Sequence, residues 1–105
     1  MSVKIVNDSN FNSFKEEKKI ALIDFFADWC GPCRMVAPVV HEIAEEHPEY
    51  AVGKINVDDA PELAREFGVF SIPTLVVLKD GDEADRAVGY RSKDAILAML
   101  ESVGG

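Results

Sequence analysis

Two cysteines, Cys30 and Cys33, stand three positions apart in the segment DWCGPC (28–33). The segment directly follows IALIDFFA (20–27), a run that is apolar except for Asp24. Such a run predicts a central strand that is buried on both faces. Apolar residues then recur at helical spacing, which predicts an amphipathic helix over residues 31–47. We therefore expect the cysteine pair where a strand passes into the start of a helix.

The spacing of the two cysteines suits a reversible disulfide. On a helix, residues i and i+3 lie about 5 Å apart at Cα, within the range of about 4.4–6.8 Å that a disulfide accepts. So small a loop is a poor structural staple, because closing it removes little entropy from the unfolded chain. Cys30 is expected in the first turn, where unpaired amides and the helix dipole favour a thiolate. Cys33 should be more buried, so Cys30 would attack a disulfide and Cys33 would resolve it.

The pair could have two other roles. A structural zinc site needs four Cys or His ligands, whereas His41 and His47 should face different sides of one helix, on the surface. We therefore predict no metal. A structural disulfide is rare in the cytosol. The start MSVKIVNDSN has no secretory signal, so we expect a cytoplasmic protein with a catalytic pair.

Length and composition limit the other possibilities. The chain has 105 residues, 48% of them hydrophobic and 29% charged, so we expect a single domain over residues 1–105. Its apolar runs are too short to span a bilayer, which argues against a membrane protein. A net charge of −8 without a basic stripe argues against nucleic-acid binding. The lack of a long exposed apolar stripe favours a monomer.

Short apolar segments alternate with helical patterns, which predicts an α/β sheet with helices on both faces. Residues 3–6, 20–27, 51–57, 74–78 and 84–88 are the predicted strands, with a hairpin turn at KDGD (79–82). A first helix would carry Phe11 and Phe14, with Asp8 or Ser9 as its cap. Further helices are expected over 31–47, over 61–67 with Gly68 ending it, and from Ser92 onward. Pro38 should bend the second helix, Met35 should pack in the core, and the last helix should bury Ala95, Ile96, Met99 and Leu100.

Longer segments of the chain resemble the thioredoxin family over essentially its whole length. They are DFFADWCGPCRMVAPVVHEIAEE, GKINVDDAPELAREFGVFSIPTLVVLKDG and VGYRSKDAILAML, and WCGPC followed by SIPT is highly specific. The resemblance implies an α/β thioredoxin fold, in which four helices flank a central five-stranded mixed sheet of order 1-3-2-4-5. It also implies a protein-disulfide reductase that serves electron transport and cell redox homeostasis. Its disulfide would be recycled by a thioredoxin reductase drawing on NADPH. No cofactor should bind this chain, which has no Gly-rich phosphate loop.

The resemblance also assigns roles near the cysteines. Cys30 becomes the nucleophile and Cys33 the resolving thiol, with Gly31 and Pro32 as the dipeptide typical of reducing members. Asp24 matches the family's buried acid. Burial raises the pKa of such a carboxyl, which would let it accept the proton of Cys33. Lys54 matches the family's nearby lysine and would tune Asp24.

Further positions match the family's substrate groove. Trp29 would shield the cysteines and line the docking surface. Pro73 matches the proline that follows a cis bond, which leaves the backbone of Ile72 free to pair with an extended substrate. Gly89 matches a glycine of the groove.

The chain departs from the family pattern at Phe26, Phe70, Tyr90 and Arg91, which bears on partner preference. Two alternatives to a reductase stay open. One is an oxidase or isomerase, although Pro32 stands where a histidine would make the disulfide more oxidising. The other is a redox-inert binding module that docks partners around Trp29 and Ile72.

Overall fold

The computed structural model describes residues 3–104, and within them strands and helices alternate as the sequence predicts. Each predicted element is present, with bounds that differ from the prediction by one or two residues. In chain order they are β1 (Val3–Ile5), α1 (Phe11–Phe14), β2 (Ile20–Phe26), α2 (Gly31–Glu46), β3 (Ala51–Asn56), α3 (Pro61–Glu66), β4 (Thr74–Lys79), β5 (Asp82–Val88) and α4 (Lys93–Gly104).

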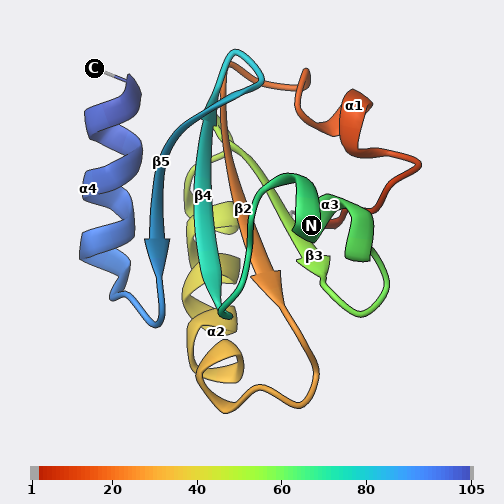
Figure 1. Cartoon of the computed structure of the whole chain (residues 1–105). Coiled ribbons are helices and arrows are strands. Elements are labelled where there is room, and N and C mark those ends of the chain that lie inside the picture. The colour runs from red at the N-terminus through yellow and green to blue at the C-terminus, as the bar shows by residue number, and fades with distance from the viewer. Residues whose placement is uncertain (1–2, 105) are drawn as a thin grey trace.

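The strands form one mixed sheet in the order β1-β3-β2-β4-β5 (Figure 1). The strands β1, β3 and β2 are parallel, and β4 and β5 run antiparallel to their neighbours. The predicted fold class and strand order are therefore confirmed. The central position of β2 agrees with its sequence, because a strand flanked on both sides and covered on both faces has to be almost wholly apolar.

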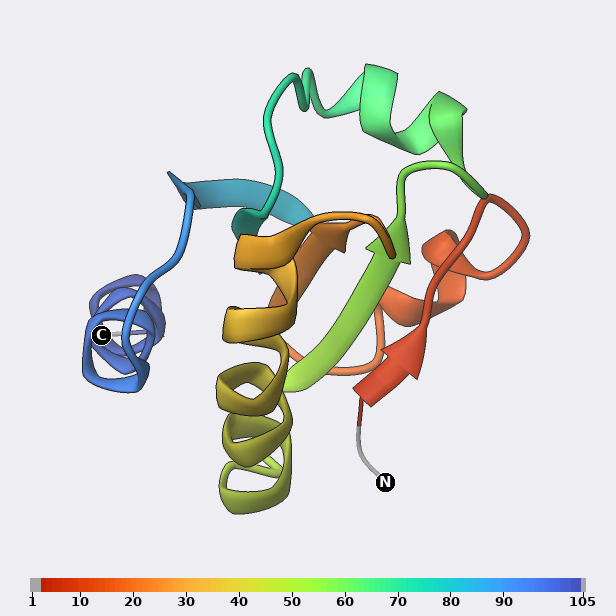
Figure 2. The ribbon, with the colours of Figure 1, turned by 90° about the horizontal axis from the view of Figure 1, so that it is seen from below.

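Helices cover both faces of the sheet (Figure 2). Helices α1 and α3 pack on one face, where Phe14 and Leu63 join Ile23 and Phe25 of β2 in a buried cluster. On the other face α2 and α4 pack against residues that include Leu22 of β2. Side chains alternate along a strand, so Asp24 shares the face of Leu22 and points to the side of α2.

Turn and cap residues define several element ends as predicted. Asp80 and Gly81 have φ values of 52° and 87°, as the two-residue hairpin turn between β4 and β5 requires. Gly68, with φ of 63°, follows the end of α3. Ser92 Oγ accepts a hydrogen bond from the Ala95 amide at 3.2 Å and caps α4.

The predicted cap of α1 is wrong. Asn10 precedes the helix, rather than Asp8 or Ser9, and it makes no side-chain capping bond. The reason is the side chain of Asn7, whose Oδ1 accepts from the Ser9 amide at 2.9 Å and so folds residues 7–10 into a turn.

The placement of Met35 in the core is also wrong, because its side chain is 63% exposed. The buried stripe of α2 consists of Cys33, Val36, Val40, Ile43 and Ala44. Met35 lies beside this stripe and belongs to the surface. In α4, Ile96 and Leu100 are buried as predicted, while Ala95 and Met99 are half-buried.

Pro38 lies inside α2, as predicted, and the helix continues through it to Glu46. In residues 3–104 no helix is long and apolar enough to cross a membrane.

Gly53 in β3 should tolerate no larger side chain. A Cβ there would lie 2.7 Å from Cγ2 of Val6 and 2.9 Å from the ring of Phe14. Gly53→Ala should therefore lower the free energy of unfolding by about 1–3 kcal/mol through overpacking. Urea denaturation measures this loss. Gly31→Ala is the control, because a Cβ at Gly31 meets no atom within 4 Å; equal losses in both variants would contradict the prediction.

Candidate active site

Cys30 and Cys33 form a disulfide where β2 leads into α2, at the end of the sheet where β4 begins (Figure 1). Their Cα atoms lie 5.3 Å apart, as the spacing in the sequence predicts. Both residues are buried, at 5% and 3% exposure, so the expected difference in burial between them is slight.

Cys30 is the N-cap residue of α2, one position before the first turn in which it was expected. Its backbone is extended, with φ of −94° and ψ of 114°, and Gly31 is the first helical residue. The Cys33 amide donates a hydrogen bond to Cys30 Sγ at 3.2 Å. The sulfur thus takes the place of the oxygen that caps most helices, and this amide and the helix dipole stabilise negative charge on it.

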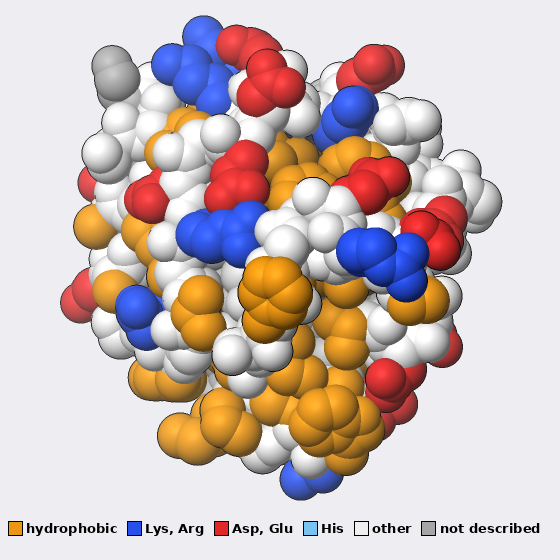
Figure 3. All heavy atoms as spheres, viewed as in Figure 1, with side chains coloured by type: hydrophobic (Ala, Val, Ile, Leu, Met, Phe, Trp, Pro, Cys, Tyr) orange, Lys and Arg blue, Asp and Glu red, His pale blue; other side chains and the backbone are white. Residues whose placement is uncertain are grey.

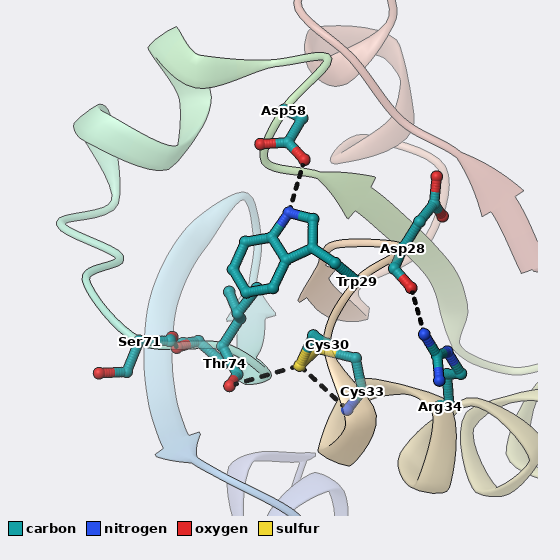
Figure 4. The surroundings of a disulfide bond; sticks show 9 residues. Asp28, Trp29, Cys30, Cys33, Arg34, Asp58, Ser71 and Thr74 are labelled. Atoms are coloured by element: carbon teal, nitrogen blue, oxygen red, sulfur yellow. Dashed lines mark hydrogen bonds between the residues drawn. A yellow bond between two sulfur atoms is a disulfide. The ribbon is translucent and has the colours of Figure 1, made fainter.

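Trp29 lies on the surface next to the pair, with 68% of the residue exposed. Its indole Nε1 donates a hydrogen bond to Asp58 Oδ2 at 3.0 Å (Figure 4). Asp58 follows the end of β3, the parallel neighbour of β2. The ring is therefore held in one orientation beside the cysteines although it is largely open to solvent.

Asp24 is buried on the α2 side of the sheet and is 3% exposed. In the described part of the chain its Oδ1 has no hydrogen-bond partner. Burial raises the pKa of this carboxyl from the ordinary value of 3.8 to about 7, and the charge of Lys54 lowers it in part. Asp24 can therefore exchange a proton near neutral pH.

Asp24, Cys33, Lys54 and Arg34 line one cavity of about 260 Å³. Lys54 is the register partner of Asp24 across β2 and β3. Among residues 3–104 Lys54 forms no ion pair, and its Nζ lies over the ring of Phe26, 5.4 Å from the centroid. Arg34 is held at the rim of the cavity, where its Nη2 donates to the Asp28 carbonyl at 3.0 Å (Figure 4). The buried acid thus shares a space with the inner cysteine and two cations.

The loop before β4 lies against Cys30. Its Ile72–Pro73 peptide bond is cis, as predicted. The Ile72 carbonyl oxygen lies 3.7 Å from Cys30 Sγ. The Ile72 amide donates no hydrogen bond within residues 3–104. Gly89, with φ of 93°, donates its amide to the Pro73 carbonyl at 2.7 Å and joins the end of β5 to this loop.

Asp58 and Arg34 were not predicted from the sequence as residues of the site. A signal for Asp58 was present, because parallel neighbours end at the same edge of a sheet, so residues that follow β2 and β3 come close together. The contact of Arg34 with the Asp28 carbonyl had no such signal. His41 is exposed on α2, as predicted, whereas His47, which follows the last residue of α2, is half-buried and pairs with Glu49 at 2.9 Å. Among the described residues no group of three His, Cys, Asp or Glu side chains could hold a metal ion.

A cysteine pair that closes a disulfide at the N-terminus of a helix, beside a buried acid and a cis-proline loop, defines a thiol–disulfide exchange protein. Comparisons with known proteins agree. The family model described as Thioredoxin matches residues 2–102. The thioredoxin of Chlamydia caviae is 48% identical over 98 residues, which cover 93% of this chain and 95% of the relative. That of Staphylococcus epidermidis is 43% identical over 102 residues, which cover 96% and 97%.

Solved structures give the same result. A mutant thioredoxin from Halobacterium salinarum superposes with a TM-score of 0.93 at 37% identity, covering 99% of this chain and 92% of the other. The chain therefore belongs to the thioredoxin family, and it is a thiol–disulfide oxidoreductase.

The buried Asp24 should make stability depend on pH. Because the native carboxyl titrates near pH 7 and the unfolded one near 3.8, the native state binds more protons between these values. The free energy of unfolding should thus fall as pH rises from about 4 to about 7, by up to about 4 kcal/mol for a shift of about 3 pKa units. Asp24→Asn should remove this fall and be more stable than the parent protein at pH 8.

Urea denaturation of both oxidised proteins between pH 4 and pH 8 measures the effect. Asp59→Asn serves as the control, because Asp59 is exposed in the turn before α3. This variant should follow the parent curve. Parallel curves for the parent protein and Asp24→Asn would contradict the prediction.

Proposed function

We propose that Cys30 is the nucleophile and Cys33 the resolving thiol in the reduction of protein disulfides. The observation that carries this assignment is the hydrogen bond from the Cys33 amide to Cys30 Sγ at the N-terminus of α2. This bond and the helix dipole stabilise the thiolate form of Cys30 and no comparable donor reaches Cys33 Sγ within residues 3–104. Gly31 and Pro32, the two residues between the cysteines, are both exposed.

The reaction balances in two exchanges. The Cys30 thiolate attacks one sulfur of the substrate disulfide, forms a mixed disulfide and releases the other substrate sulfur as a thiolate. Cys33 then loses its proton and attacks Cys30 Sγ, which breaks the mixed disulfide and releases the second substrate thiol. The chain ends with the Cys30–Cys33 disulfide, and the substrate has gained two electrons.

Asp24 is proposed as the acceptor of the Cys33 proton. It shares the cavity of about 260 Å³ with Cys33, and its pKa of about 7 suits a group that takes and returns a proton at neutral pH. Lys54 stabilises the ionised carboxylate and so sets how readily Asp24 accepts the proton.

Trp29, Ile72, Pro73 and Gly89 are proposed to bind the substrate. The Ile72 amide has no partner in the described residues, and its carbonyl oxygen lies next to Cys30 Sγ. An extended substrate segment could pair with both groups as an added strand and so bring its sulfur to Cys30. The fixed ring of Trp29 would cover one side of this segment.

The oxidised chain needs a separate two-electron donor, and we propose a thioredoxin reductase for this role, with the cytoplasm as the compartment and a monomer as the working form. Pro32 supports the reducing direction, because no histidine stands between the cysteines to stabilise the reduced form. Titration against a glutathione buffer measures the reduction potential. A value near the general figure for thioredoxins, about −270 mV, is expected, and a value near about −180 mV would favour an isomerase.

Serine variants of the two cysteines separate the proposed roles. Cys30→Ser should lower the rate of insulin reduction by dithiothreitol to that of dithiothreitol alone. Cys33→Ser should also lose turnover but should accumulate a mixed disulfide with insulin, because attack still occurs and resolution does not. Turbidity reports the rate, and mass spectrometry under non-reducing conditions reports the adduct.

Each cysteine variant is the control for the other. An adduct on Cys30→Ser and none on Cys33→Ser would reverse the assignment. Partner binding that persists unchanged after loss of both sulfurs would favour the redox-inert binding module.

A further inference from the structure

The exposed apolar side chains of this molecule gather around Cys30. Within residues 3–104 the large exposed hydrophobic residues are Ile5, Trp29, Met35, Phe70, Val88 and Tyr90. All but Ile5 lie on segments that meet at the cysteine pair: the start of α2, the loop before β4 and the end of β5. Figure 3 shows hydrophobic side chains gathered over this lower part of the face. In a chain of net charge −8, so local an apolar surface indicates a binding site.

Phe70 is the most exposed member of this group, at 96%. The side chain makes no ring contact with any residue in the described part of the chain. Trp29, by contrast, is held by Asp58. An aromatic ring that is almost wholly exposed adds nothing to the core of its own chain and is free to pack against a partner.

The loop that carries Phe70 is nevertheless fixed at both ends. At its start, Arg86 of β5 donates through Nη2 to the Phe67 carbonyl at 2.5 Å. The same guanidinium binds both carboxylate oxygens of Glu83, at 2.6 Å and 2.8 Å. At its end, Thr74 Oγ1 donates to the Ser71 carbonyl at 2.5 Å. The backbone thus holds Phe70 at a defined distance from Cys30.

The aromatic contacts of Phe67 reinforce the first anchor. Its ring lies 5.6 Å from that of Phe11 and 5.5 Å from that of Phe25, centroid to centroid. Phe67 therefore cannot shift without disturbing the core. Because the loop begins at Phe67, this packing and the hydrogen bond from Arg86 together fix the start of the loop.

The reaction determines which molecule contacts this surface. A substrate sulfur has to come within bonding distance of Cys30 Sγ, so the residues that flank the substrate cysteine must touch whatever surrounds Cys30. Phe70 precedes Ile72, whose carbonyl oxygen lies 3.7 Å from Cys30 Sγ, by two positions. Two residues of an extended substrate segment span about 7 Å. A side chain about two residues from the substrate cysteine is therefore within reach of the ring.

We propose that Phe70 is a specificity-determining residue, which selects protein disulfides with a large apolar side chain about two residues from the cysteine. The proposal rests on the proposed function, since it names the substrate class of the same site. Contact between this side chain and Phe70 removes apolar surface of both from water during the attack by Cys30, and so speeds the first exchange for such substrates.

Peptide disulfides test the proposal. The substrates are symmetrical disulfides of seven-residue peptides that differ only in Phe or Ser two positions before or after the cysteine. Stopped-flow fluorescence of Trp29, with the reduced chain in single turnover, gives the second-order rate constant. The parent protein should favour a Phe peptide about tenfold, and Phe70→Ala should reduce this ratio to about twofold. Phe70→Leu should give an intermediate ratio.

Two controls accompany these variants. Ile5→Ala removes an exposed side chain on β1, which is the edge strand opposite β5 in the sheet. This variant should leave the ratio unchanged. Bis(2-hydroxyethyl) disulfide carries no flanking side chain, so its rate constant should be the same in the parent protein and in Phe70→Ala.

Arg86→Gln tests the anchor of the loop and should lower the ratio in the same direction as Phe70→Ala. Arg65→Gln is the matched control, because Arg65 pairs with Glu62 at 2.7 Å through an exposed side chain. An unchanged ratio in Arg86→Gln would overturn the role of this anchor.

Each contrary result has a distinct meaning. A ratio unchanged by Phe70→Ala overturns the proposal, and so does an equal loss with all disulfides. Sedimentation that finds a dimer in the parent protein and a monomer in Phe70→Ala assigns the surface to a second copy, which also overturns it. Failure of the parent protein to reduce even bis(2-hydroxyethyl) disulfide would instead contradict the proposed function.

Discussion

The chemistry of this chain depends on one hydrogen bond, from the Cys33 amide to Cys30 Sγ at the start of α2. The bond makes the sulfur of Cys30 the N-terminal cap of a sixteen-residue helix, so one interaction both caps the first turn and stabilises a thiolate at Cys30. It also requires that the chain leave β2 in an extended conformation at Cys30 and turn helical at Gly31. The sheet, which fixes where β2 ends, and the core stripe of α2, which fixes where that helix lies, are what hold the two sulfurs within bonding reach.

Asp24 shows the cost of placing a carboxyl next to this pair. Local consistency favours an apolar residue at the centre of a buried strand, and natural sequences break such rules mostly at functional sites. Here the alternation of β2 directs the carboxyl to the face of α2, beneath Cys33, where burial raises its pKa to about 7. Lys54 offsets part of this effect from the neighbouring strand without forming a direct ion pair. The cavity that they share keeps the acid near Cys33, the thiol whose proton we propose that it accepts.

The strand order and the roles of most site residues were implied by the resemblance to the thioredoxin family. The elements, the α/β class and the position of the cysteine pair were predicted from the sequence itself, because their signals are local. The apolar run of β2, the helical stripe of α2, the turn at Asp80–Gly81 and the CxxC spacing each depend on a few consecutive residues. The contact between Arg86 and Phe67, by contrast, joins distant segments, and nothing near Phe67 indicates it. The contact of Trp29 with Asp58 can be inferred only once β2 and β3 are known to be parallel neighbours. Met35 was misplaced because its neighbour Val36 carries the buried stripe, and a shift of one residue on a helix changes the direction of the side chain by about 100°.

The polar strand β5 illustrates how such distant contacts give one sequence segment two uses. As the outermost strand it would expose unpaired backbone groups, and its charged residues discourage pairing with another chain. One of these charges, Arg86, is also bound by Glu83 and reaches the carbonyl of Phe67 across the sheet edge. Because the loop that starts at Phe67 carries Phe70 and Ile72 to Cys30, the composition of this edge strand and the shape of the surface around the disulfide cannot vary independently.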